Sequence, residues 1–170
     1  MPATASMIDP TRVDATAQFP VGYEIGDPRG GQFSGNTIKY VRANGTIATG
    51  DAVHTDVSFA TAAERHATVI STSAVSQMVE GVNDLNAGLT AGQFGWITVD
   101  GRAQAKTSGV AAGDKLGTTA TGGTLGPLTA SATPTQAEVI AAIAAAAGRG
   151  AKAQTATGTP VTGQSFVRLS

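Results

Sequence analysis

The residues best suited to chemistry in this chain are two histidines and two aspartates. His54 and His66 are twelve residues apart and fit no His-x-x-x-His or Glu-x-x-His spacing, whereas a metal site needs several convergent ligands. Asp51 and Asp114 each follow a Gly, and paired carboxylates could serve acid–base catalysis or bind Ca²⁺. An Asp after Gly is also explained by a turn in which its side chain accepts a backbone N–H. We favour turn aspartates and solvated histidines, and predict no catalytic and no metal-binding residue.

Motifs for nucleophilic catalysis and phosphate binding are also missing from the sequence. No Gly-x-Ser-x-Gly elbow occurs, and no Gly-x-Gly-x-x-Gly or Walker loop joins a strand to a helix. We therefore expect a protein that is not an enzyme and that binds no cofactor.

Trp96 is the aromatic residue that allows a second kind of function. Strand alternation from 94 to 99 predicts Phe94, Trp96 and Thr98 on one face, and Ile97 and Val99 on the other. An exposed Trp could stack on a sugar, whereas a buried one would anchor a small core. We favour the core anchor. The other predicted core anchors are Tyr40 and Phe166.

A repeated turn phrase indicates the elements that must position these residues. An Ala-x-Gly-Asp or Ala-Gly-Asp turn occurs within 45–53 and again within 109–116, each time after a Gly and before an apolar residue. A third copy at 88–99 has Ala-Gly-Gln and leads into the strongest predicted strand. Such turns deliver the chain into β-strands. The pattern predicts a mainly β protein, either a small β-barrel or a β-sandwich.

The two ends of the chain are expected to differ from this β-domain. Residues 1–20 have no sustained period, which predicts an extended N-terminal arm beside a β-rich domain over 21–170. Thr135 and Glu138 have capping-box spacing, so we predict one Ala-rich helix over about 136–147, which could cover a barrel end or form a partner-binding ridge.

Two further signals concern the strands near the end of the chain. The Asp100–Gly101 pair is the strongest hairpin signal, and we expect a turn there. The run 165–169 predicts a C-terminal strand that docks into the sheet.

Composition narrows the possible partners. The formal net charge is −1, only 14% of residues are charged, and there is no Cys. A basic field for nucleic acid or an anionic membrane is therefore not expected, nor is a disulfide framework. The longest apolar run, 139–147, is too short to span a membrane. Because Ala, Gly and Thr bury little area each, we expect a homo-oligomer.

Four segments resemble small virion structural proteins of tailed bacteriophages. The opening Ile38-Lys-Tyr-Val-Arg-Ala-Asn-Gly leads to Gly50-Asp-Ala-Val, and the centre reads Gly92-Gln-Phe-Gly-Trp-Ile-Thr-Val-Asp-Gly. An Ala112-Gly-Asp-Lys-Leu turn and a closing Phe166-Val-Arg-Leu follow. The resemblance spans about residues 19–169.

This resemblance implies a capsid decoration (cement) protein, which clamps neighbouring major capsid proteins on the outside of the head, commonly as a trimer. Such a protein would be made in the host bacterial cytoplasm and located on the outer capsid surface. Ile8, Val13 and Phe19 are the apolar residues by which the arm would contact the capsid. The alternatives are a carbohydrate-binding or host-attachment module of the virion, and a neck or tail component.

Overall fold

The computed structural model describes residues 8–56, 67–74, 77–128, 151–153 and 161–169, and side chains in 8–56, 67–74, 77–128 and at 169. The described chain is mainly β, and its single helical element is a 3-10 turn, η1 (Gly31–Phe33). The strands are β1 (Glu24–Gly26), β2 (Thr37–Ala43), β3 (Ile47–Ala48), β4 (Ala52–Thr55), β5 (Thr68–Ser71), β6 (Gly81–Val82), β7 (Gly88–Leu89), β8 (Phe94–Val110), β9 (Lys115–Thr118), β10 (Leu125–Pro127), β11 (Ala151–Ala153) and β12 (Val161–Leu169).

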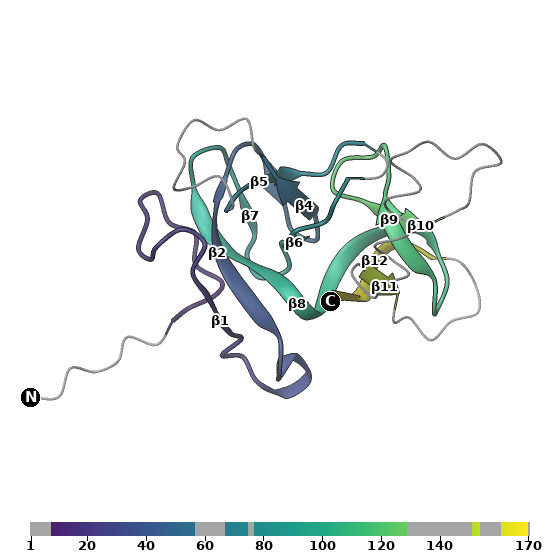
Figure 1. Cartoon of the computed structure of the whole chain (residues 1–170), viewed down its shortest axis with the longest axis horizontal. Coiled ribbons are helices and arrows are strands. Elements are labelled where there is room, and N and C mark those ends of the chain that lie inside the picture. Colours follow the sequence, from purple (N-terminus) through teal and green to yellow (C-terminus); the bar gives the residue numbers. More distant parts are fainter. Residues whose placement is uncertain (1–7, 57–66, 75–76, 129–150, 154–160, 170) are drawn as a thin grey trace, which may run out of the picture.

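The 17-residue strand β8 organises the sheet, and Figure 1 shows it running between two groups of strands. Its first part pairs with β2 and β6, and its second part pairs with β12 and β10. Starting from β8, the successive hydrogen-bonded neighbours β2, β5, β4 and β6 lead back to β8, and so do β10, β9, β11 and β12. The pairings therefore form two closed cycles that share β8. We call them the first and the second ring. The small pair β3–β7 is separate.

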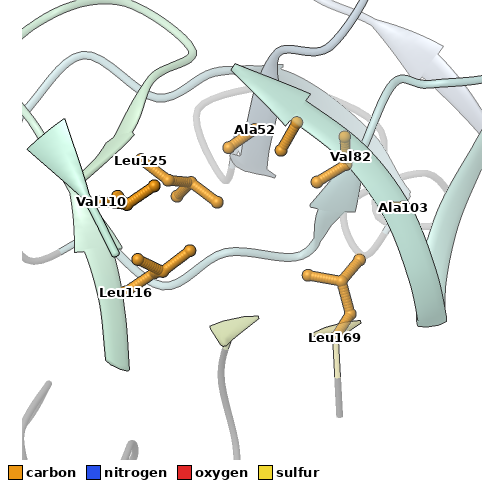
Figure 2. Packing of buried hydrophobic residues seen from close by; sticks show 8 residues of the cluster. Ala52, Val82, Ala103, Val110, Leu116, Leu125 and Leu169 are labelled. Atoms are coloured by element: carbon orange, nitrogen blue, oxygen red, sulfur yellow. The ribbon is translucent and has the colours of Figure 1, made fainter. Parts of the chain in front are cut away.

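Alternation along β8 divides its side chains as the sequence predicted. Ile97 lies in the core of the first ring, with Val99 packed against it, and Trp96 lies in a cluster on the other face with Phe94 packed against it. The first core consists of Val41, Ala43, Ile47, Val53, Val69, Leu89 and Ile97. The second core, drawn in Figure 2, consists of Ala52, Val82, Ala103, Ala105, Val110, Leu116, Leu125 and Leu169. Ala52 and Val82 come from strands of the first ring, so the second core packs against that ring.

The hairpin expected at Asp100–Gly101 is wrong, because β8 continues through both residues. Gly101 has φ +96°, and the β2–β8 register shifts just before it, between Thr98 and Asp100, so the strand bends without reversing. The Asn36 side chain acts there as a short strand partner: its Nδ2 donates to the Arg102 carbonyl over 2.7 Å and its Oδ1 accepts the Arg102 N–H over 2.8 Å. Leu169 of β12 pairs with Gly101 itself. Pairing with these distant residues continues the strand, and it outweighs the local preference of Asp-Gly for a turn.

The extended arm is also corrected for the residues that the structure describes. Residues 8–20 fold back over β2 and β8, with Asp14 and Phe94 exchanging two backbone hydrogen bonds of 2.9 Å. Ile8 and Phe19 pack against the Trp96 cluster, and Val13 packs against the first core. Burial of these side chains on the protein itself offsets the entropy that an ordered segment loses.

Two further predictions concern the rest of the chain. The Ala-rich helix over about 136–147 lies outside the described residues. The C-terminal strand is present as β12, whose longest pairing is with β8. No helix in the described part of the chain has the length and hydropathy that a membrane span requires.

Candidate functional site

The two aspartates of the repeated phrase occupy the same kind of turn. In each turn the Gly before the Asp has a left-handed φ, 82° and 87°, and the Asp N–H donates to the carbonyl three residues back. Asp51 Oδ2 accepts the Ala48 N–H over 2.8 Å, and Asp114 Oδ2 accepts the Ala111 N–H over 2.7 Å. The prediction that these side chains bind nearby backbone N–H groups is confirmed.

The third copy of the phrase keeps the same bond without an aspartate. Gln93 Oε1 accepts the Thr90 N–H over 2.8 Å, and the Gln93 N–H donates to the Thr90 carbonyl. The Gly92 φ of 85° matches the other two turns. The phrase therefore specifies a turn with a side-chain acceptor at its fourth position. Asp supplies this acceptor in two of the turns, and Gln supplies it in the third.

Asp51 differs from Asp114 because it also joins the two rings. Its side chain is buried, and its Oδ1 binds Lys106 Nζ at 2.5 Å while its Oδ2 accepts the Ser71 hydroxyl at 2.7 Å. Lys106 lies on the second part of β8, and Ser71 ends β5. With its oxygens bound to a lysine, a hydroxyl and an amide, Asp51 fits a structural link better than a general base.

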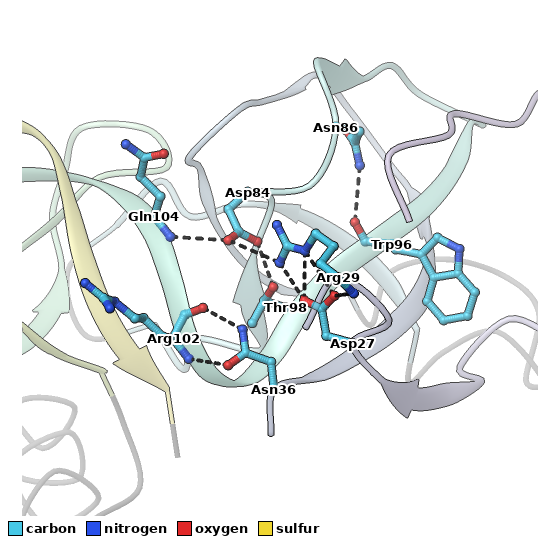
Figure 3. A network of polar contacts seen from close by, with 9 residues as sticks. All are labelled: Asp27, Arg29, Asn36, Asp84, Asn86, Trp96, Thr98, Arg102 and Gln104. Atoms are coloured by element: carbon cyan, nitrogen blue, oxygen red, sulfur yellow. Dashed lines mark hydrogen bonds and ion pairs between the residues drawn. The ribbon is translucent and has the colours of Figure 1, made fainter. Parts of the chain in front are cut away.

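Figure 3 shows a second polar network, at the bend of β8. Arg29 binds Asp27 through two guanidinium nitrogens, at 2.6–3.0 Å, and lies 4.0 Å from Asp84. The Thr98 hydroxyl donates to Asp84 over 2.7 Å, and the Gln104 N–H donates to it over 3.3 Å. Burial raises the pKa of the Asp84 carboxyl above its usual range, against the effects of Thr98 and Arg29.

This network holds elements of the fold together. Both carboxylates are buried and share one arginine, whose guanidinium carbon also lies 3.9 Å above the Phe33 ring centroid. Arginine cannot act as a base at neutral pH, and the network contains no histidine or nucleophilic serine. It ties η1 and the β1–β2 connection to the residues that follow β6.

The histidines form no metal or catalytic cluster within the described chain. His54 Nδ1 lies 3.0 Å from its neighbour's carbonyl at Thr55, and Nε2 lies 3.2 Å from the Gln77 side-chain amide. His66 lies outside the described residues. Among the described residues there is no group of three His, Asp or Glu able to hold a metal ion.

The aromatic cluster on the outer face of β2 and β8 contains two of the three predicted anchors. Tyr40 and Trp96 are paired across these strands, their ring centroids are 5.1 Å apart, and Trp96 is only 1% exposed. The Trp96 ring is therefore covered and cannot serve as a stacking platform. Phe166 lies in β12 opposite Gln104, but its side chain is outside the described part.

Tyr40 also connects the N-terminal segment to this cluster. Its hydroxyl donates to Asp14 over 2.8 Å and accepts the Gln18 N–H over 3.2 Å. Burial, with further contributions from the Asp14 carboxylate, raises the pKa of the Tyr40 phenol to about 12. Phe19 covers the same rings, with its centroid 5.3 Å from those of both Tyr40 and Trp96.

The sheet leaves one free edge among its described strands, at β1. Each other strand of the ten-stranded sheet has at least two partner strands, whereas β1 pairs with β2 alone. The Asp27 N–H donates to the Asn36 carbonyl, and the Tyr23 carbonyl accepts the Tyr40 N–H. Because the backbone groups of successive residues point to opposite sides of a strand, those of Glu24 and Gly26 point away from β2. These groups can bind an added strand.

Comparisons with known proteins give one weak likeness. No family model and no curated protein matches the chain. A solved structure, the N base of the head fiber gp8.5 of bacteriophage phi29, has a TM-score of 0.47 and 14% sequence identity, and the match covers 78% of this chain and 92% of that one. At this score and identity the likeness supports no conclusion about function.

Sequence patterns alone did not find the polar network of Figure 3 or the free edge. Asp27, Arg29 and Asp84 come from loops far apart in the chain, so no spacing links them. One signal was available: Asp27-Pro28 before two glycines is typical of a tight connection that needs a side-chain anchor.

Proposed function

We propose that this chain is a structural virion protein of a tailed bacteriophage, and specifically a capsid decoration subunit. It binds major capsid proteins on the outside of the head and stabilises the contacts between them. The protein acts as a homo-oligomer, a trimer in the simplest case, and performs no reaction. Many weak contacts repeated over a closed shell would give it high avidity.

The observation that supports this proposal is where the virion-like motifs lie. The opening motif forms β2 and the central motif forms the first part of β8, and these strands pair with Tyr40 opposite Trp96. The Ala-Gly-Asp turn directly precedes β9. The resemblance therefore involves one connected framework of strands and turns instead of scattered short matches.

The free edge of β1 provides the mode of binding. We propose that an extended segment of a major capsid protein adds to this edge, using the backbone groups of Glu24 and Gly26. Backbone pairing needs no charge complementarity between the two surfaces. It therefore suits a chain whose net charge is near zero.

Two variants at one position test this mode. Gly26→Pro removes an outward N–H without removing a β1–β2 hydrogen bond, whereas Gly26→Ala is the matched control because a Cβ there meets nothing within 4 Å. Both proteins should fold. In co-sedimentation with capsids that lack the protein, the wild type and Gly26→Ala should bind, and Gly26→Pro should bind much less. Equal binding by all three would exclude the β1 edge, and no binding by the wild type would refute decoration.

One observation favours a carbohydrate-binding module as the second candidate. Tyr23 is 43% exposed, and its ring is nearly parallel to that of Phe19, 6.4 Å away. Such a supported, exposed ring can stack on a sugar. A glycan array probed with the wild type and Tyr23→Ala separates the candidates: specific glycan binding that the variant loses would favour host attachment over decoration.

A further inference from the structure

Strand alternation gives the free edge of β1 two chemically different faces. Glu24 is paired with Lys39 of β2, and its carboxylate lies 3.6 Å from Lys39 Nζ. The two chain neighbours of Glu24 lie against the aromatic cluster on the other face. Ile25 packs against that cluster, and the Tyr23 ring centroid lies 6.2 Å from that of Trp96. A strand added to β1 would therefore meet Glu24 on one face, and Tyr23 and Ile25 on the other.

The Glu24 face carries an excess of negative charge. Lys39 Nζ binds Glu80 at 2.5 Å, closer than it lies to Glu24, so two glutamates share one lysine. Among the side chains that the structure describes, Lys39 is the only cation within ion-pair distance of either glutamate. The Glu24 side chain is 52% exposed, whereas that of Lys39 is 10% exposed. A cation from a partner can therefore reach Glu24 and balance the second glutamate.

Gly26 leaves room on this face for a long side chain. It lies two residues after Glu24, so both positions belong to the same face of the strand. A Cβ added to Gly26 meets nothing within 4 Å. A lysine or arginine of the added strand can lay its apolar stem across Gly26 and place its charged end beside Glu24.

The other face offers apolar surface to the added strand. Tyr23 is 43% exposed, and Ile25 is partly exposed at the border of the aromatic cluster. Apolar side chains of an added strand would cover the exposed parts of both residues, and the removal of this area from water favours binding.

We propose that the β1 edge selects an extended segment of a major capsid protein whose side chains alternate between basic and apolar. Lys or Arg lies on the Glu24 face, and apolar residues lie on the face of Tyr23 and Ile25. Backbone pairing supplies the contact, while the alternation sets the choice of segment and its register. This inference deepens the proposed function and rests on it, because it names the kind of segment that the edge accepts.

Two short peptides, blocked at both ends, test this selectivity. Each has Val at alternate positions, and the positions between are Lys in one peptide and Glu in the other. The wild-type chain should bind the Lys peptide about tenfold more tightly at low ionic strength, because a charge beside Glu24 is attracted in one peptide and repelled in the other. Isothermal titration calorimetry measures both dissociation constants, and the preference should shrink as salt is added.

Variants of the edge assign this preference to its two faces. Glu24→Lys should reverse it, since Lys39 keeps its bond to Glu80 and the added cation now attracts the Glu peptide. Thr121→Lys, at an exposed loop position of the second ring, controls for added positive charge and should keep the wild-type preference. Tyr23→Ala should weaken the binding of both peptides and leave their ratio unchanged. Gly26→Pro should abolish the binding of both.

Several results would overturn the inference: equal affinities for the two peptides, no measurable binding of either, or a preference that Glu24→Lys leaves unchanged. Capsid co-sedimentation of the same variants distinguishes its failure from that of decoration. Capsid binding that survives both Gly26→Pro and Glu24→Lys would leave decoration intact and overturn the inference. A peptide preference in a chain that binds no capsid would refute decoration and leave the selectivity of the edge standing.

Discussion

The bend of β8 can be tested by an alanine at Gly101. A Cβ on Gly101 would lie 2.2 Å from Asn36 Oδ1 and 2.9 Å from Asn36 Cα, at a φ of +96°. The left-handed φ costs an ordinary residue about 1–2 kcal/mol. Displacing the Asn36 amide loses two hydrogen bonds to Arg102, at about 0.5–1.5 kcal/mol each. We expect Gly101→Ala to lower the free energy of unfolding by about 2–5 kcal/mol.

A matched control on the same strand separates these two contributions. Gly109 also has a left-handed φ, +64°, but a Cβ there meets nothing within 4 Å. Gly109→Ala should therefore cost only the backbone strain of about 1–2 kcal/mol. Urea unfolding followed by Trp96 fluorescence measures both variants, since Trp96 is the single Trp of the chain.

A double-mutant cycle with Asn36 tests the cause directly. Asn36→Ala alone should cost about 1–3 kcal/mol for the two lost hydrogen bonds. Once Asn36 is gone, Gly101→Ala no longer displaces it, so the double variant should be about 1–3 kcal/mol more stable than the sum of the single effects predicts. Additive effects, or a Gly101→Ala cost equal to that of Gly109→Ala, would refute the account of the bend.

Four further predictions concern stability, and equilibrium unfolding in urea measures each of them. Trp96→Ala should cost about 3–5 kcal/mol, because the ring is buried among other aromatic rings; unchanged stability would contradict its place in the core. Stability should fall as the pH rises from 10 to about 12, since the raised pKa of Tyr40 favours the neutral phenol in the folded state, and Tyr40→Phe should remove this dependence. Asp51→Ala should cost about 2–4 kcal/mol and Asp114→Ala about 0.5–1.5 kcal/mol, because Asp51 alone of the two also binds Lys106 and Ser71; equal costs would contradict the ring-joining role. Deleting residues 2–18 should lower the free energy of unfolding by at least about 2 kcal/mol, because the Asp14 contacts to Tyr40 and Phe94 are lost. Unchanged stability would instead favour the prediction of an extended arm.

Local sequence patterns predicted the features that depend on neighbouring residues. The repeated turns, the alternation of Trp96 against Ile97 and the C-terminal strand all follow from spacing within a few residues, and the structure has each of them. The mainly β class follows from these local features, since turns at short intervals leave room for strands and little else.

Features that depend on distant contacts could not be predicted in the same way. Asp100–Gly101 carries a genuine turn signal, but Asn36 and Leu169 offer the chain a longer strand there, and neither is near in sequence. The segment 8–20 lacks periodicity because it covers a sheet face without forming a strand of its own, so its pattern resembles that of a free arm. Asp27, Arg29 and Asp84 converge only after β1, β2 and β6 have been placed.

Copy number per particle tests the proposed decoration role most directly. The proposed function implies a phage that encodes the chain. Its purified virions can be dissolved, and the chain can be quantified against the major capsid protein by mass spectrometry with labelled peptides. Decoration predicts a copy number close to that of the major capsid protein or a simple fraction of it. This number should be the same in heads with and without tails. A handful of copies per particle, or copies that disappear with the tail, would contradict the account and favour a neck or tail component.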